Sequence, residues 1–94
     1  MQEKRIVWDE KKNKTNQSKH RIGFEEAATV FFDTLALTVE DDEHSWHEFR
    51  FFTIGVTETQ KLIVVFYVET EFEIRIISAR KPTRNERLQY EEGS

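Results

Sequence analysis

The chain has 94 residues, of which 34% are charged and 13% aromatic, with a formal net charge of −4 at pH 7 and no cysteine. This length predicts a single domain, residues 1–94, because it suffices for one hydrophobic core. Without cysteine, a disulfide framework, a thiolate metal site and a cysteine nucleophile are excluded, which favours a cytoplasmic protein. No run approaches the roughly 18 apolar residues of a membrane span, so we expect no membrane association.

Residues 5–8 predict a short strand, and residues 9–20 follow almost without apolar positions, with Asp9 as the candidate cap. A helix that is polar all round is marginal unless it packs by its ends or serves as a surface. Five apolar residues then recur at helical spacing, which predicts an amphipathic helix over residues 23–35 with one buried face. They are Phe24, Ala27, Ala28, Phe31 and Leu35.

The second half of the chain predicts four strands, at residues 35–39, 49–56, 61–69 and 71–79, with a hairpin loop at 57–60. The third of them is apolar at odd and even positions alike, as expected of a central strand covered on both faces. The fourth alternates, so that its even and odd positions face opposite sides of the sheet. One side carries Phe72, Ile74 and Ile76, and the other carries Glu73, Arg75 and Ile77.

The last predicted element is a helix, which opens with Thr83 and Glu86 in a capping-box pattern and includes Leu88 and Tyr90. Pro82 stands just before it and ends the preceding strand. The resulting order, β-α-α-β-β-β-β-α, predicts an α+β domain. We expect an antiparallel sheet of four to five strands with helices packed on it.

Positive charge is gathered in two segments of the chain. Seven of the 14 Lys and Arg residues lie in residues 4–21 and five in residues 75–87, whereas residues 40–43 are consecutive acids. The net charge of −4 argues against a nonspecific polycation. A local cluster can still create a potential of several kT, so the sequence allows a local anion site.

Two histidines, His44 and His47, lie beside the acidic residues 41–43. No predicted helix places the two imidazoles in register for a metal ion, so we interpret this segment as an acidic loop. Glycine-rich phosphate-binding motifs are also missing, and the chain has only three glycines. We therefore expect no metal and no other cofactor.

Imidazole, cationic and carboxylate side chains occur in the combination that metal-free RNA cleavage requires. A base takes the proton of the 2′-hydroxyl, an acid protonates the leaving 5′-oxygen, and fixed cations stabilise the crowded phosphate. Imidazole titrates near pH 6.5 and serves either proton role, and guanidinium binds phosphate oxygens bidentately. A solvated surface is the alternative from the residues alone, with an arginine such as Arg75 paired to Glu73. The candidates are Lys19, His20, Glu48, Arg50, Arg75, Arg80 and Lys81.

Four segments resemble, in order and spacing, the BrnT toxins of type II toxin–antitoxin pairs, and the likeness runs from residue 8 to residue 92. The segments are WDEKKNKTNQSKH, FEEAATVFFD, HEFRFFTIG and IRIISARKPTRNERLQYEE. The resemblance implies a small ribonuclease with a RelE-like fold that arrests translation by cutting RNA. It also implies a BrnA-type protein antitoxin, through which alone the pair binds operator DNA.

The resemblance assigns roles to residues at matching positions. It implies a catalytic site formed by His20, Glu48, Arg50, Arg80 and Tyr90, with Glu48 and His20 as the general base and acid in an order left open. RNA binding is expected at Lys19, Arg75, Lys81 and Arg84.

The sequence departs from the family pattern at two positions: Arg21 stands where the family has glycine, and Pro82 where it has alanine. Two alternative functions stay open. One is a toxin-like module that binds its antitoxin but cuts nothing, which Arg21 would favour. The other is a nucleic-acid-binding regulator, against which the acidic run at 40–43 and the lack of a helix-turn-helix pattern argue.

Overall fold

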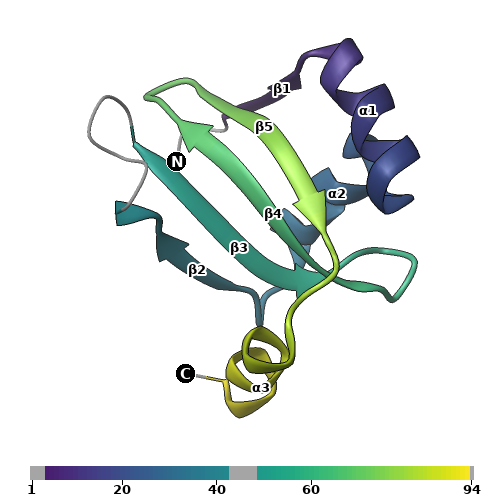
Figure 1. The fold of residues 1–94 in the computed structure, drawn as a ribbon. Coiled ribbons are helices and arrows are strands. Elements are labelled where there is room, and N and C mark those ends of the chain that lie inside the picture. The colour runs from purple at the N-terminus through teal and green to yellow at the C-terminus, as the bar shows by residue number, and fades with distance from the viewer. Residues whose placement is uncertain (1–3, 43–48, 94) are drawn as a thin grey trace.

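The computed structural model describes residues 4–42 and 49–93 (Figure 1). The predicted order of strands and helices is confirmed, with a short 3₁₀ helix added. The elements are β1 (Arg5–Trp8), α1 (Glu10–His20), α2 (Phe24–Ala28), the 3₁₀ helix η1 (Thr29–Phe32), β2 (Leu37–Glu40), β3 (Arg50–Val56), β4 (Leu62–Glu69), β5 (Glu73–Arg80) and α3 (Arg84–Glu92). Within these described ranges, no helix is long and apolar enough to cross a membrane.

The five strands form one sheet in the order β1-β5-β4-β3-β2. Strands β2 to β5 pair antiparallel, but β1 pairs with β5 in parallel. The prediction of an antiparallel sheet is therefore wrong at one edge, and the sheet is mixed. A strand of four residues carries too little pattern to specify its neighbour. The helices α1 and α2 carry the chain from β1 at one edge of the sheet to β2 at the other, and the antiparallel strands β2 to β5 then return it to β1 (Figure 1).

The predicted amphipathic helix ends earlier than its pattern indicates. α2 stops at Ala28, η1 continues to Phe32, and Leu35 is 74% exposed instead of buried. The chain turns at Asp33, whose backbone is extended and whose carboxylate accepts the N–H groups of Leu35 and Val56, both at 2.9 Å. These bonds compete with a further helical turn, which explains why the apolar periodicity beyond Phe31 was misleading.

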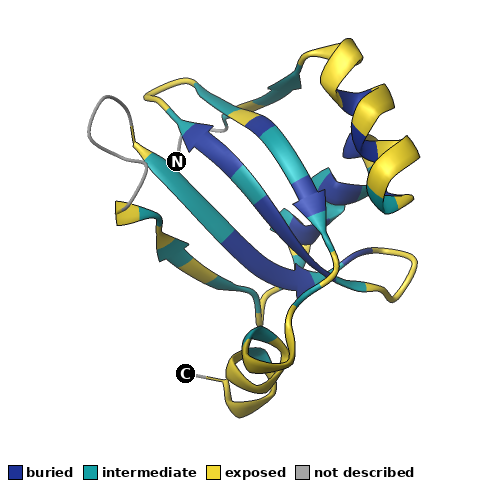
Figure 2. Cartoon of the chain, in the orientation of Figure 1, coloured by how far each residue is buried: buried dark blue, intermediate teal, exposed yellow. Residues whose placement is uncertain are grey.

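The core lies between one face of the sheet and the helices α1 and α2. β4 is central, and both of its faces are buried, as predicted. On the helical side of the sheet, Phe24, Ala27 and Val30 are fully buried (Figure 2). The helix α3 lies at one end of the sheet and has no buried residue.

The polar helix α1 is held to the sheet by hydrogen bonds. Its two buried residues are Asn13 and Asn16. The amide of Asn16 donates to the carbonyls of Ile22 and Ala79, both at 2.9 Å, and accepts the N–H of Ala79 at 3.1 Å. The β1 pairing ends at Ile76, so Asn16 satisfies a β5 backbone that β1 no longer covers. Asn13 likewise accepts the N–H of Phe24 at 2.8 Å.

A β-bulge in β5 changes which face its arginines occupy. Phe66 pairs with Ser78 but Tyr67 pairs with Ile76, so one residue of β5 is extra. The predicted alternation therefore holds only as far as Ile76. Arg75 and Arg80 are five residues apart and would otherwise point to opposite faces. With the bulge, they pair with β4 residues of the same parity and share the face turned away from α1 and α2.

Replacing Asn16 with alanine should lower the free energy of unfolding by about 2–3 kcal/mol, because buried backbone groups of Ile22 and Ala79 lose their partners. Urea denaturation followed by circular dichroism measures this change. Ser18→Ala, an exposed substitution on the same helix, is the control and should change stability by less than about 0.5 kcal/mol. Equal stability of the two variants would show that Asn16 does not hold α1 to the sheet.

Candidate functional site

Five basic side chains surround a pocket at one end of the sheet. The pocket has a volume of about 560 Å³ and lies where the C-terminal end of α1, the start of β4 and the segment after β5 meet. None of the described residues that line it is acidic. We call it the cationic pocket; it is lined by His20, Arg21, Ile22, Lys61, Leu62, Ile63, Lys81, Pro82 and Arg87.

The end of α1 contributes two of these basic residues. His20 is in the last helical turn, where the macrodipole favours basic side chains. Arg21 is the C-cap in the left-handed conformation, with φ of 60°, and its N–H donates to the carbonyl of Gln17 at 2.9 Å. Glycine adopts this conformation at lower cost, so an arginine here is a strained choice.

The other basic residues come from segments far apart in the sequence. Lys61 follows the β3–β4 turn and lies 3.5 Å from a carboxylate oxygen of Glu26. Lys81 follows β5, and Arg87 belongs to α3. Sequence reasoning missed Lys61 and Arg87, and it noted Arg21 only as a departure from the family pattern. Lys61 and Arg87 stand near the beginning of predicted elements, and only the fold brings them to the same pocket.

Arg80 is held by an ion pair with Glu86 and does not line the cationic pocket. Its guanidinium donates to both carboxylate oxygens of Glu86, at 2.8 and 3.0 Å, and to the carbonyl of Lys81 at 3.0 Å. Its central carbon also lies 5.1 Å from the ring centroid of Phe66. Arg80 is therefore not a solvated side chain, which was the alternative interpretation of the basic residues. These contacts fix the backbone of Lys81 and the first turn of α3.

The same ion pair shifts the pKa values of both partners. Hydrogen bonding to Glu86 raises the pKa of Arg80, and hydrogen bonding from Arg80 lowers the pKa of Glu86 against the opposing effect of burial. Glu86 also completes the predicted capping box with Thr83, accepting its N–H at 2.8 Å. One carboxylate therefore serves both the helix cap and Arg80.

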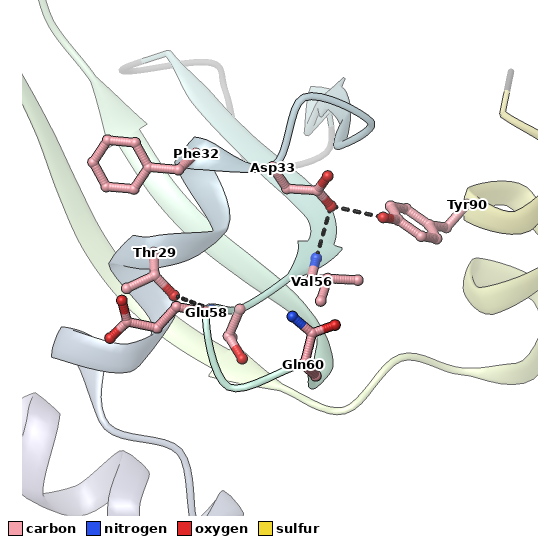
Figure 3. A pocket seen from close by; sticks show the side chains of 8 residues that line it. Thr29, Phe32, Asp33, Val56, Glu58, Gln60 and Tyr90 are labelled. Carbon is pink, nitrogen blue, oxygen red and sulfur yellow. Dashed lines mark hydrogen bonds between the residues drawn. The ribbon is translucent and has the colours of Figure 1, made fainter.

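Tyr90 is placed away from the cationic pocket and anchors α3. Its hydroxyl donates to the carboxylate of Asp33 at 2.7 Å (Figure 3). Burial and the hydrogen bond to Asp33 raise the pKa of Tyr90 to about 12. Burial acts to raise the pKa of Asp33, but hydrogen bonds from Val56, Tyr90 and Leu35 outweigh it, and the pKa is lowered. At neutral pH the Tyr90 hydroxyl is therefore a proton donor in a hydrogen bond and not a base.

The remaining predicted residues do not converge on the cationic pocket. Arg50 and Arg75 both pair with Val68, about 20 Å along β4 from Leu62 at the rise of a strand. Arg75 lines a separate pocket of about 740 Å³. Lys19, with His20, lines a neighbouring pocket of about 490 Å³.

Arg84 is exposed in the first turn of α3. The prediction for Glu48 lies outside the described residues, as do His44 and His47. Within residues 4–42 and 49–93, no three His, Asp or Glu side chains gather to hold a metal ion.

A small α+β domain with a cationic pocket at one end of its sheet has a local site suited to anionic groups such as phosphate, despite its negative net charge. Residues 8–86 match the family model described as ribonuclease toxin, BrnT, of type II toxin–antitoxin system. Since that match spans most of the chain, the protein belongs to the BrnT family of ribonuclease toxins. Tyr90 lies beyond the matched residues.

Solved structures include a protein of similar fold, the ribonuclease toxin BrnT of Brucella abortus, known from a crystal structure at 1.1 Å resolution. The two chains are 22% identical, with a TM-score of 0.66, and the alignment covers 87% of this chain and 100% of the other. This likeness concerns the fold. None of the curated proteins compared with this chain matches it. The RelE-like character implied by the sequence stays a prediction.

Replacing Glu86 with glutamine should lower stability in a pH-dependent way. The pKa of Glu86 is lowered in the folded state. The contribution of Glu86 to the free energy of unfolding is therefore fully present at pH values above its unfolded pKa of about 4.3, and it is lost as pH falls through the folded-state pKa. We expect Glu86→Gln to cost about 1 kcal/mol at pH 7, since Arg80 is partly screened by solvent, and almost nothing at pH 3. Urea denaturation at several pH values measures the difference.

The control for this experiment is Glu91→Gln on the exposed side of α3, which should match the parent within about 0.5 kcal/mol at every pH. A cost for Glu86→Gln that stays constant from pH 7 to pH 3 would contradict an ionic origin.

Proposed function

We propose that this protein is a metal-independent endoribonuclease that holds a phosphate of its RNA substrate in the cationic pocket. The observation that carries the proposal is the convergence of His20 with four cations from four separate segments. A pocket of this charge attracts phosphate oxygens, and arginine binds them with two parallel hydrogen bonds.

The pocket offers groups for two of the three tasks in RNA cleavage. His20 is the candidate proton-transfer group, since a neutral imidazole takes a proton and an imidazolium supplies one. Lys81 and Arg87 are the candidates for stabilising the negative charge that develops on the phosphate. Glu48 is proposed as the second proton-transfer group. Lys19, Arg75 and Arg84 are proposed to bind the RNA strand beyond the cleaved bond.

Arg80 is assigned an indirect role in this mechanism. Its bonds to Glu86 and to the carbonyl of Lys81 set the direction of the segment that carries Lys81 and of the helix that carries Arg87. It is thus a positioning residue for the cationic pocket. Tyr90 anchors the other end of the same helix through Asp33.

The cellular role proposed here follows from membership of the family. Cleavage of RNA in the cytoplasm would arrest translation. A BrnA-type antitoxin would end this activity by covering the cationic side of the toxin, for which acidic and apolar residues are complementary. Contact with operator DNA would occur only through the antitoxin.

Cleavage of a structured RNA should continue in EDTA and should depend on the cationic pocket. Lys81→Ala should lower kcat about 10²–10³-fold, the range for losing one oriented electrostatic donor. His20→Ala should lower it about 10²–10⁴-fold and remove one limb of the pH–rate profile. Single-turnover cleavage rates, with thermal unfolding measured in parallel, test both.

Lys14→Ala is the matched control, because Lys14 is an exposed lysine of α1 that does not line the cationic pocket. It should cut at the rate of the parent. Complete loss of the parent's cleavage on chelation, restored by Mg²⁺ or Mn²⁺, would contradict the metal-independent mechanism. A parent that cuts no RNA under any condition would favour the antitoxin-binding module instead.

Replacing Arg21 with glycine should weaken RNA binding without destabilising the fold. Glycine suits the left-handed backbone at this C-cap, whereas the pocket loses one cation. The slope of log affinity against log salt should fall by about 0.7, the value for one phosphate contact on a single strand. Fluorescence anisotropy at several salt concentrations measures it. An unchanged slope would remove Arg21 from the RNA interface.

A further inference from the structure

A second pocket lies on the other side of the β3–β4 turn, and its charge is opposite to that of the cationic pocket. It has a volume of about 550 Å³ and includes two carboxylates, while none of the described residues that line it is basic (Figure 3). A phosphate would be repelled here, whereas an uncharged, planar group would not. We call it the turn pocket; it is lined by Thr29, Phe32, Asp33, Val56, Thr57, Glu58, Gln60 and Tyr90.

Gln60 places an amide at this pocket from a strained backbone position. Its φ is 68°, in the left-handed region where a hairpin turn favours glycine or asparagine. The turn itself is firmly closed, because Thr57 and Lys61 are joined by a backbone hydrogen bond of 2.8 Å and Gln60 donates to the carbonyl of Thr57 at 2.9 Å. In Figure 3 the side chain of Gln60 points toward Val56.

The amide of Gln60 is free to bind a ligand. Within the described part of the chain, its oxygen and nitrogen have no hydrogen-bond partner, so both a donor and an acceptor are available. Only two described residues other than glycine have a positive φ, namely Arg21 and Gln60. Each lines one of the two pockets, and at each a glycine would be less strained.

Two aromatic side chains flank the turn pocket. Phe32 is 82% exposed, an unusual position for a phenyl ring, and it lies at the end of the pocket opposite to Tyr90 (Figure 3). Tyr90 is held rigid by its bond to Asp33. Aromatic faces of this kind stack on the unpaired bases of RNA, and an amide pairs with base edges.

The two pockets are lined by residues that are neighbours in the chain. Gln60 and Lys61 are consecutive, and they line the turn pocket and the cationic pocket respectively. Tyr90 and Arg87 are three residues apart on α3, about one helical turn, and Tyr90 lines the turn pocket whereas Arg87 lines the cationic pocket. Both pockets thus draw residues from the β3–β4 turn and from α3, an arrangement that suits a strand with a phosphate in one pocket and a base in the other.

We propose that the turn pocket binds a nucleobase of the RNA substrate, next to the phosphate held in the cationic pocket, and that Gln60 reads the edge of that base. This inference rests on the proposed function and extends it, because it gives the enzyme a base preference at one position. The cationic residues bind the phosphates of every RNA sequence alike, whereas the amide of Gln60 discriminates among the bases.

The test uses a pool of RNA oligonucleotides with a randomised window, whose cut sites are mapped by sequencing. The parent should prefer one base at a fixed distance from the cut by about tenfold, the discrimination of one well-placed bidentate contact. Gln60→Gly should retain or raise the melting temperature, keep cutting, and lose most of this preference. The salt slope of binding should stay unchanged.

Two control variants separate the base contact from other effects. Gln89→Ala removes an exposed glutamine beside Tyr90 that lines neither pocket, and its preference should equal that of the parent. Arg21→Gly should weaken binding to all sequences equally and leave the preference intact. A preference that survives in Gln60→Gly, or cleavage by the parent without any preference, would overturn the proposal while leaving the ribonuclease activity in place.

A second measurement does not depend on cleavage. The four nucleoside 5′-monophosphates are titrated into the protein, and chemical shifts of the Gln60 side-chain amide and of Tyr90 are followed by NMR. Shifts of the Gln60 side-chain amide and of Tyr90 that differ among the four bases, with the base dependence at Tyr90 lost in Gln60→Gly, would support the proposal even if the protein cut no RNA. No shift at these residues would overturn it. Weaker antitoxin binding by Gln60→Gly, with unchanged base preference, would assign the turn pocket to the antitoxin and also overturn it.

Discussion

The amide of Asn16 is the contact on which the rest of the structure depends. It binds the backbone of Ala79 in β5 and of Ile22 in the loop after α1, and so joins three segments at one buried point. His20 stands four residues further along α1, on the same face of the helix. Docking Asn16 therefore also directs His20 toward the end of β5, where Lys81 follows. A helix without apolar residues gains a fixed place because buried backbone groups require partners.

The other side of the cationic pocket is set by Arg80 and its carboxylate partner. Glu86 closes the capping box of α3 and binds Arg80 with both oxygens, so the start of α3 is tied to the end of β5. α3 buries no residue, and these polar contacts attach it to the sheet together with the bond of Tyr90 to Asp33. Arg80, the most conspicuous basic residue in the sequence, therefore positions the cationic pocket and does not line it. The residues that line the pocket include less conspicuous ones such as Lys61.

Local sequence patterns predicted the structure correctly where the interactions involved lie within one short segment of the chain. The cap at Asp9, the capping box of Thr83 with Glu86, and the hairpin loop at 57–60 were all predictable and are all present. Prediction failed where a distant segment intervened. Asp33 ends the helix before Leu35 by binding the N–H of Val56, which is 23 residues away. β1 takes β5 as its parallel neighbour, a choice that four residues could not encode.

The sequence by itself determined the order of the elements and the central place of β4, because periodicity is a property of the chain alone. Its membership of a ribonuclease toxin family came from the resemblance of its segments to that family and from the match of residues 8–86 to the family model. The tertiary structure decided which of the many basic residues share a pocket. The bulge in β5 puts Arg75 and Arg80 on one face, while about 20 Å of strand separates Arg75 from the cationic pocket. The sequence alone does not say where a charged side chain lies in space, because the hydrogen bonds of the fold decide that position. In this protein the hydrogen bonds of Asn16 and the β-bulge in β5 place the basic side chains.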